Sequence, residues 1–546
     1  MIGGAAVAEA TVSEPLLGPG VAIGAVQPAA AMPAVPALSA ATKQHWVEGT
    51  AALTTALMVE RGTGLLANVL AARLGGAAVF GSYSLAISTA NNVSTYAAGG
   101  IGATATRFSG KYPHSSHEYG SLARALAVVA LVSAAMATAA LWAGAVPLAH
   151  LLQKPGLAGL LRWASLSAAG MIVLECARGF FVGQRRVAAL LLLSVLVGAG
   201  LLLALPMAAR QGSAARMVLL QAGVCFAAVA VCLLLNRTLA LRGKVSRRGR
   251  LCTMLREVWG FGTVQLSGMV AANLAGWWLT TLIARSDRTL VQVGFFAIAS
   301  QMRNLAGVVP GLLTEGSYAV MAAPEEMDSA AQQRSQHRVM ALASFASSAV
   351  GLGIACVGIV IAPWALRLLY GRTYVSAQGA LAVALALAVA HMSNAPASAR
   401  LTIVDIRWAG LINTAWAVCV GAAATLLLFH GGGAWQGLAI LLAAHLISAT
   451  LVLTSLQRKD HVPAGMRTAY YLGSLGASVL AGLALLRAWQ PRYTGPLTVC
   501  MILLAAMQLL WLAALGKRHH WIPSRSALLE VRDRVFRIRQ KERAHV

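Results

Sequence analysis

Arginine side chains lie deep inside two apolar segments of the chain. Arg61 falls within the stretch 47–72, and Arg303 falls within the stretch 290–318. If these stretches are helices, each arginine lies about 20 Å along its helix at 1.5 Å per residue. A charged side chain at the centre of a bilayer costs about 2.5–3.5 kcal/mol on insertion scales, so it must face a partner or a water-filled cavity. Because a guanidinium donates two parallel hydrogen bonds to a phosphate or carboxylate, both arginines are candidate contacts for an anionic substrate.

Polar residues occupy corresponding positions in the two halves of the sequence. The pairs at an offset of 212 residues are Arg61 with Asn273, Asn91 with Arg303, and Asn92 with Asn304. Together with Arg178, these six side chains form the predicted substrate-binding set. We expect them to line a cavity between two related lobes. The alternative is structural pairing, of Arg61 with Glu60 and of Arg303 with a nearby acid.

Acidic residues inside apolar segments are candidates for coupling a cation to transport. These residues are Glu60, Glu175 and Glu315. Glu175 is three residues before Arg178, so an internal ion pair on one helix face is an equal alternative. Glu315 could instead meet a basic loop. His391 and His445 are isolated in the sequence, and we interpret each as a hydrogen-bonded packing residue, with a proton relay as the alternative.

The composition indicates that these residues belong to a polytopic membrane protein. Of 546 residues, 58% are hydrophobic and 11% are charged, whereas about a quarter of a soluble chain is charged. Apolar stretches of about 20 residues, enough to cross a bilayer, recur throughout. The fourteen predicted spans are 47–72, 78–103, 121–149, 158–184, 187–209, 215–236, 257–284, 290–318, 338–365, 376–398, 408–429, 433–455, 468–488 and 496–516. The predicted fold class is an all-α membrane helix bundle.

The net charge of +26 is distributed in a way that indicates orientation. If the N-terminus is cytoplasmic, the inside segments carry 28 Lys and Arg and the outside loops carry 10. The positive-inside rule then places both termini in the cytoplasm. The basic residues are spread between apolar stretches, which argues against nucleic acid as a partner. The tail from 526 to 543 has an apolar face and many arginines, and it predicts contact with anionic lipid.

A short internal repeat divides the chain into two parallel halves. Ala72-Arg73 matches Ala284-Arg285, and Gly81 then matches Gly294 after one inserted residue. Since six predicted helices separate the copies, both halves have the same orientation. The predicted organisation is a disordered tail over 1–42, an N-lobe over 43–240, a basic linker over 241–256, a C-lobe over 257–456, two extra helices over 457–516 and a basic tail over 517–546.

A family resemblance rests on two short motifs. They are Ala72-Arg73-Leu74-Gly75 followed by Phe80-Gly81-x-Tyr83-x-x-Ala86, and Leu369-Tyr370-Gly371-Arg372-Thr373-Tyr374. In order and spacing, residues 45–515 resemble the Wzx-type polysaccharide flippases of the multidrug/oligosaccharidyl-lipid/polysaccharide exporter superfamily. The resemblance implies two six-helix lobes around a central cavity. It also implies movement of an undecaprenyl-pyrophosphate-linked oligosaccharide to the periplasmic leaflet, with a polysaccharide polymerase and export machinery as partners.

Other functions are less consistent with the sequence. A glycan polymerase or ligase needs a large outward loop for its acceptor, and the predicted outside loops are short. A drug/cation antiporter would be expected to present unpaired acids in its cavity. A lipid II flippase would carry a chemically similar substrate, and the sequence leaves this function open. The sequence contains no P-loop, no HExxH motif and no paired CxxC, so we expect no catalytic residue, metal or cofactor.

Overall fold

The computed structural model describes residues 40–112, 118–235, 248–321, 329–459, 462–519 and 521. This part of the chain is helical and contains no β-strand. It divides into two compact units, the first ending at Ala51 and the second beginning at Ala52. The site residues considered below lie in the second unit. The predicted tails fall outside the described residues, except that helix begins at Ala40 and the last predicted span continues to Arg518.

The helices follow one another along the chain with short connections. They are α1 (Ala40–Ala98), α2 (Ile101–Lys111), α3 (Tyr119–Leu151), α4 (Leu157–Gly183), α5 (Val187–Arg210), α6 (Ala214–Leu235), α8 (Arg248–Ser286), α9 (Val291–Ala306), α10 (Val308–Met321), α11 (Ser329–Leu369), α12 (Gln378–Val404), α13 (Ile406–Leu428), α14 (Ala434–Lys459), α15 (Ala464–Trp489) and α16 (Thr494–Arg518). Two 3-10 turns, η1 (Arg372–Ala377) and η2 (Pro491–Tyr493), precede α12 and α16.

Most residues of the fourteen predicted spans lie in these helices, and the all-α fold class is confirmed. Eleven helical segments of the described chain are long and apolar enough to cross a membrane, and the first of them, Met58–Ala98, holds most of the first two predicted spans. Three boundaries differ from the prediction. The first two spans form one helix run, α1, kinked at Gly76 with φ 76° and ψ 170°, a conformation that glycine adopts without steric cost. The predicted linker 241–256 is already helical from Arg248.

The third difference concerns the span predicted over 290–318. It is broken at Gly307, where α9 ends and α10 begins. A side chain at Gly307 would meet the methyl group of Met392 in α12 at 2.7 Å. Glycine therefore allows α12 to pack closely against the break.

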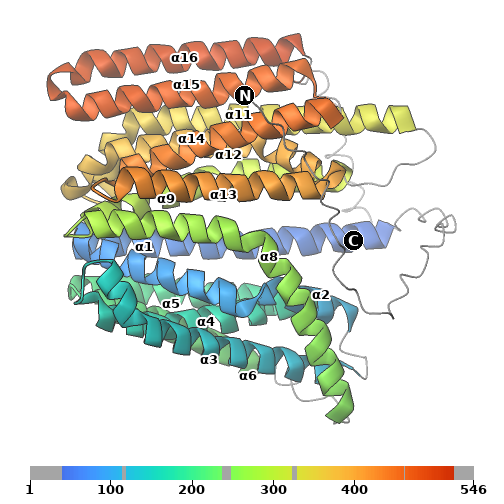
Figure 1. Cartoon of the computed structure of the whole chain (residues 1–546). Coiled ribbons are helices and arrows are strands. Elements are labelled where there is room, and N and C mark those ends of the chain that lie inside the picture. The colour runs from blue at the N-terminus through green and yellow to red at the C-terminus, as the bar shows by residue number, and fades with distance from the viewer. Residues whose placement is uncertain are drawn as a thin grey trace, which may run out of the picture. The chain divides into compact units, whose positions relative to one another are not determined.

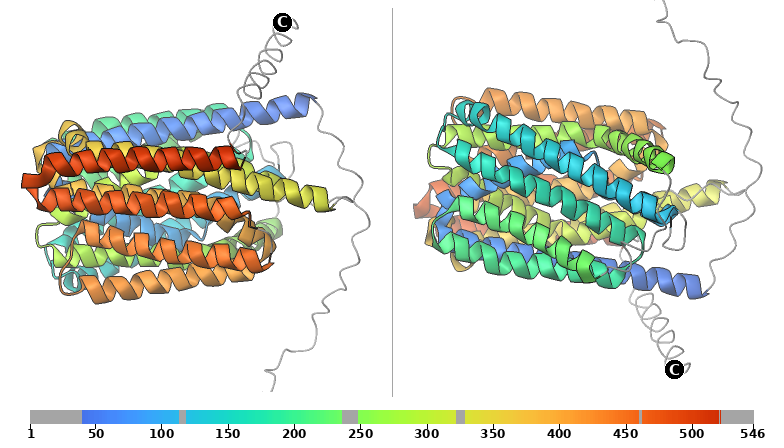
Figure 2. Two further views of the ribbon diagram at one scale, coloured as in Figure 1. Left: turned by 90° about the horizontal axis from the view of Figure 1, so that it is seen from above. Right: turned by 90° about the horizontal axis from the view of Figure 1, so that it is seen from below.

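The second unit contains two groups of helices (Figure 1). In the N-terminal helix group, α2–α6, α4 packs against α2, α3 and α6. In the C-terminal helix group, α9–α15, α12 packs against α9, α10, α11, α13, α14 and α15. α8 contacts both groups, through α2 and α3 on one side and α13 on the other. Both views in Figure 2 show the long helices of this unit aligned along nearly the same axis. The division into lobes at the predicted boundaries stays a proposal.

The core of the C-terminal helix group depends on small residues and contains two buried arginines, Arg400 of α12 and Arg487 of α15. Every residue of α12 from Gly379 to Ala390 is buried, because alanine and glycine allow neighbouring helix backbones to approach closely. Pro363 interrupts α11, since it has no N–H to donate to the carbonyl of Ile359. Arg487 of α15 donates to this carbonyl at 3.1 Å and to that of Val360 at 3.0 Å. The buried charge of Arg487 thus satisfies backbone groups that the proline leaves without a donor.

Candidate functional site

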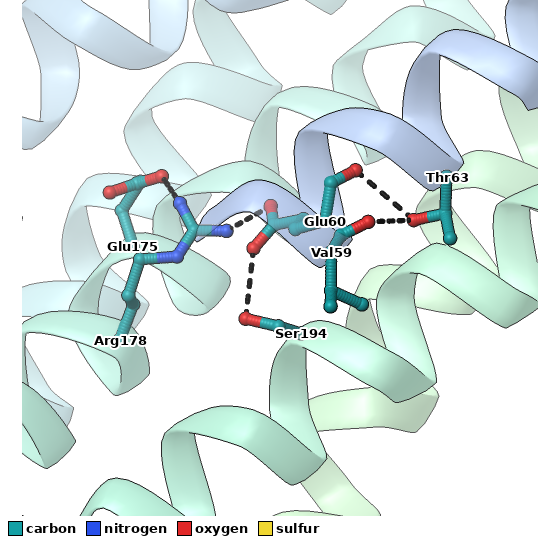
Figure 3. Close-up of polar contacts among 6 residues, drawn as sticks. All are labelled: Val59, Glu60, Thr63, Glu175, Arg178 and Ser194. Atoms are coloured by element: carbon teal, nitrogen blue, oxygen red, sulfur yellow. Dashed lines mark hydrogen bonds and ion pairs between the residues drawn. The ribbon is translucent and has the colours of Figure 1, made fainter. Parts of the chain in front are cut away.

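Two acids and an arginine from α1 and α4 form one cluster in the N-terminal half (Figure 3). The guanidinium of Arg178 pairs with Glu60 through Nη2 and with Glu175 through Nη1. Ser194 of α5 donates to the second carboxylate oxygen of Glu60 at 3.2 Å. Thr63 fixes the adjacent turn of α1, where its hydroxyl donates to the carbonyl of Val59 at 2.7 Å. We call Glu60, Glu175 and Arg178 the acidic cluster.

The acidic cluster changes the interpretation of these residues. The alternative in which Glu60 pairs with Arg61 is wrong, because Glu60 pairs with Arg178 instead. The predicted pair of Glu175 and Arg178 is confirmed. With both acids ionised, the cluster holds one more negative than positive charge. The Glu175 side chain is 52% exposed, against 21% for Glu60 and 19% for Arg178, so Glu175 is the accessible carboxylate.

Arg61 is not part of this cluster. Its side chain is exposed, and it makes no hydrogen bond or ion pair with the side chains that the structure describes. A guanidinium without a carboxylate partner is available to an anion. The structure therefore leaves Arg61 a candidate contact, and it does not bring Arg61 together with Arg303.

The asparagines fall into two kinds. Asn92 is buried and donates to the backbone carbonyl of Asn273 at 2.9 Å, which links α1 to α8. The same interface between α1 and α8 contains hydrogen bonds from Trp277 to Thr89 at 3.2 Å and from Tyr96 to the carbonyl of Val270 at 3.4 Å. Asn92 therefore packs in an interface. By contrast, the side chains of Asn91 and Asn304 are exposed and can face solvent or substrate.

Arg303 lies in the last turn of α9, just before the break at Gly307. Its guanidinium contacts the amide oxygen of Asn304 at 3.2 Å through Nη2 and 3.4 Å through Nε. It has no carboxylate partner among the residues that the structure describes. Glu315, a candidate for coupling a cation, follows in α10, and its side chain lies outside those described.

Two histidines that were predicted to be isolated packing residues stack on each other, in two helices that both pack against α9. The rings of His391 in α12 and His445 in α14 stack with centroids 4.9 Å apart and an angle of 27° between their planes. The ring of Trp416 in α13 stands edge-on to His445 at 5.0 Å. α9, which carries Arg303, packs on both α12 and α14, and a Cβ at Gly307 would lie 2.7 Å from the methyl group of Met392, the residue after His391. No spacing in the sequence signals this group, since the three helices meet only after folding.

No group of three or more His, Cys, Asp or Glu is arranged to hold a metal ion within the described ranges. Arg303 and Asn304 offer hydrogen-bond donors suited to an anion or a hydroxyl-rich molecule, and the two histidines lie on the helices that pack against α9. The acidic cluster can hold a cation.

At one end of the bundle, residues of the internal repeat hold the two halves in contact. We call this end the Gly76 end, because it contains the kink at Gly76 and the loops 152–156, 287–290, 370–377 and 429–433. Here Gly81 and Gly294 lie backbone to backbone: a Cβ on Gly81 would meet the carbonyl oxygen of Leu290 at 1.9 Å and the nitrogen of Gly294 at 2.9 Å. These two glycines are the pair matched by the repeat.

The repeat also predicts which arginines cap helices at this end. Arg73 donates to the carbonyl of Leu368 in the last turn of α11 at 2.7 Å. Its counterpart Arg285 donates to the carbonyl of Leu151 at the end of α3 at 3.0 Å. The last carbonyls of a helix have no intrahelical donor, and cations there are favourable. Each arginine thus caps a helix of the opposite half.

The carbonyls preceding both arginines accept equivalent bonds. Ala72 accepts from the hydroxyl of Tyr374 at 3.1 Å, and Ala284 accepts from the ammonium of Lys154 at 2.7 Å. Burial lowers the pKa of the Lys154 ammonium from its ordinary value. The Gly76 end is therefore closed by two sets of contacts related by the repeat.

Residues 46–314, just under half of the chain, match the model of a family described as "Polysaccharide biosynthesis protein". The resemblance predicted from the sequence is confirmed. Among solved structures, the lipid II flippase MurJ in an inward closed conformation has a TM-score of 0.61 at 13% identity, over 86% of this chain and 99% of that one. A multidrug resistance MATE family transporter of the MOP superfamily in an inward-facing conformation gives 0.53 at 16% identity, over 79% and 98%.

A third structure, a MOP superfamily transporter from Pyrococcus furiosus, gives a TM-score of 0.50 at 13% identity, over 80% of this chain and 96% of that one. Among curated proteins, no sequence matches significantly. The solved structures establish the fold over the C-terminal half as well, where the family model ends. The chain is a multi-pass membrane protein with the fold of MOP superfamily transporters.

Proposed function

We propose that the chain is a flippase that moves an undecaprenyl-pyrophosphate-linked oligosaccharide repeat unit across the inner membrane during polysaccharide biosynthesis. The family match and the fold shared with a lipid II flippase support movement of a lipid-linked glycan. The proposal rests above all on the surroundings of the Arg303 side chain. It is a membrane-embedded cation whose guanidinium contacts the amide of Asn304 and has no carboxylate partner among the described residues. Such a cation suits an anionic head group.

The polar residues divide into roles in this proposal. Arg303 and Asn304 bind the pyrophosphate, while the exposed Arg61 and Asn91 contact other parts of the head group. Asn92 and Asn273 form the wall between α1 and α8. Arg178 holds the acidic cluster instead of substrate, because both of its Nη atoms already bind carboxylates. Glu60 and Glu175 stay candidates for coupling a cation, and Glu315 is a further one.

The membrane orientation follows from the charge bias. With both termini cytoplasmic, the Gly76 end faces the periplasm and is closed, so the substrate enters from the cytoplasmic side. The basic C-terminal tail contacts anionic lipid of the inner leaflet. A polysaccharide polymerase and export machinery receive the product, and nucleic acid is not a partner.

The proposal is tested with the full chain in liposomes that contain an undecaprenyl-pyrophosphate-linked oligosaccharide ending in galactose. A membrane-impermeant galactose oxidase added outside reports only the outer-leaflet share of the lipid. We expect active protein to make the whole pool oxidisable, and protein-free liposomes to keep the inner share protected. Equal protection with and without protein would refute the proposal.

A second candidate, lipid II flipping, is favoured by the similarity to MurJ. The same assay with lipid II, detected by an impermeant reagent for its peptide amine, separates the two substrates. A drug/cation antiporter is the further alternative, and the acidic cluster is the observation in its favour. It would accumulate a cationic dye against a proton or sodium gradient and leave both lipids protected. A glycan polymerase or ligase would instead lengthen or transfer the glycan, which chromatography of the recovered lipid detects.

A further inference from the structure

The stacked histidines have an environment that suits a change of charge. α12 is surrounded by other helices, and its residues from 379 to 390 are all buried, yet the next residue, His391, is exposed. The imidazole of His391 is therefore accessible within the helix bundle. Protons can therefore reach the pair, which a packing role does not require.

The Nδ1 atom of His445 has a partner in either protonation state. It lies 2.8 Å from the carbonyl oxygen of Leu441 and 3.3 Å from Nε1 of Trp416. In the neutral ring protonated at Nε2, Nδ1 accepts the indole N–H. In the imidazolium, Nδ1 carries a proton and donates to the carbonyl. Protonation thus replaces the hydrogen bond from the Trp416 indole with one to the Leu441 carbonyl, so Nδ1 keeps a hydrogen-bond partner.

The charges around the pair determine when a proton binds. Of the helices packed on α12 and α14, α9 carries Arg303 in its last turn, and burial of the rings together with this positive charge opposes their protonation. α13 presents the neutral indole of Trp416, the side chain of Glu315 in α10 is not among those described, and α11 and α15 contribute no acting group within the described residues. A fixed guanidinium and a second imidazole disfavour an added positive charge, whereas a nearby anion favours it. A pyrophosphate diester is a dianion, and one imidazolium beside Arg303 matches that charge.

We infer that His391 and His445 form a proton site linked to anion binding at Arg303, so that the pyrophosphate head group binds together with one proton shared by the pair. The inference rests on the proposed function and adds a pH-dependent part to the same site. Because linkage is reciprocal, the bound anion promotes protonation and protonation strengthens anion binding. The two histidines are thus substrate-selective residues for a dianionic head group.

The test measures binding of a short-chain probe, P1-citronellyl P2-(N-acetylglucosaminyl) pyrophosphate, whose charge is constant between pH 5.5 and pH 8. Titration calorimetry of the full chain in detergent gives the dissociation constant, and buffers of different ionisation enthalpy give the number of protons taken up. With one linked proton, we expect affinity to weaken by up to about tenfold per pH unit as pH rises. We also expect uptake of close to one proton at the acid end.

The variants separate this inference from the proposed function. In H391Q/H445Q, uptake should vanish and binding should become independent of pH. His430→Gln, at an exposed histidine outside the pair, is the matched control and should behave as the native chain. If the native chain binds without proton uptake, or H391Q/H445Q keeps it, the proton site is wrong while the anion site stands. If the probe fails to bind at any pH, the proposed function loses its anion site as well.

Discussion

Gly81 and Gly294, which occupy the same place in the two halves of the internal repeat, contact each other through their backbones. The amide nitrogen of Gly294 lies 2.9 Å from where a Cβ of Gly81 would be, and that of Gly81 lies 3.4 Å from where a Cβ of Gly294 would be. The two contacts are equivalent: a Cβ on Gly81 would meet the carbonyl of Leu290, and a Cβ on Gly294 would meet the carbonyl of Ala77, each four residues before the partner glycine. Any motion that separates the halves at the Gly76 end must break this contact.

Gly81→Ala should open the Gly76 end. The added methyl would overlap the carbonyl oxygen of Leu290, which is backbone and cannot rotate away. Spin labels at Gln153 and Arg372, on opposite sides of this end, should show a longer distance by double electron–electron resonance in the variant. Gly144→Ala, where a Cβ meets nothing within 4 Å, is the control. An unchanged distance distribution in Gly81→Ala would mean that the contact does not hold this end closed.

Arg73→Ala and Arg285→Ala should weaken the closed Gly76 end to similar extents. Each variant removes one hydrogen bond from a cation to the C-terminus of a helix in the other half. Such a bond contributes about 1 kcal/mol when partly exposed, which changes the ratio of closed to open molecules by roughly fivefold. The same spin-label distance gives this ratio. A large effect of one arginine and none of the other would contradict the equivalence of the two contacts.

Arg178→Gln should destabilise the protein more than Glu60→Gln. Removing the guanidinium leaves two carboxylates near each other without a cation, whereas removing one carboxylate leaves a simple pair. Since the side chains of Arg178 and Glu60 are about a fifth exposed, solvent reduces the effect below that of a fully buried pair, to about 1–3 kcal/mol. Thermal unfolding in detergent measures it. The double variant E60Q/R178Q should recover part of the loss, and additive losses would exclude the direct interaction.

Arg303→Ala should abolish flipping in the galactose oxidase assay while the protein still accumulates in the membrane. Arg303→Lys should retain part of the activity, because lysine keeps the charge but loses the planar pair of donors. The described residues leave no carboxylate unpaired in the Ala variant, so we expect its melting temperature to stay near that of the native chain. Disappearance of the variant from the membrane, or normal flipping, would show that Arg303 does not bind substrate.

The sequence by itself determined the membrane helices and the parallel repeat. A bilayer requires long apolar segments with satisfied backbones, so composition and segment length are sufficient to locate them. The repeat was readable because Ala72-Arg73 and Ala284-Arg285 make equivalent contacts and so keep the same residue types. The break at Gly307 was missed, since a glycine in an apolar run is compatible with a continuous helix.

The partners of the charged residues were decided only by the tertiary structure. Glu60 is adjacent to Arg61 in sequence, yet successive residues on a helix point in different directions, and Glu60 pairs with Arg178 across 118 positions. His391 and His445 are 54 positions apart, and they stack because α12 and α14 pack side by side. Local spacing constrains only neighbours on one helix. Which faces of different helices meet depends on how all the helices pack together, and that packing created the site.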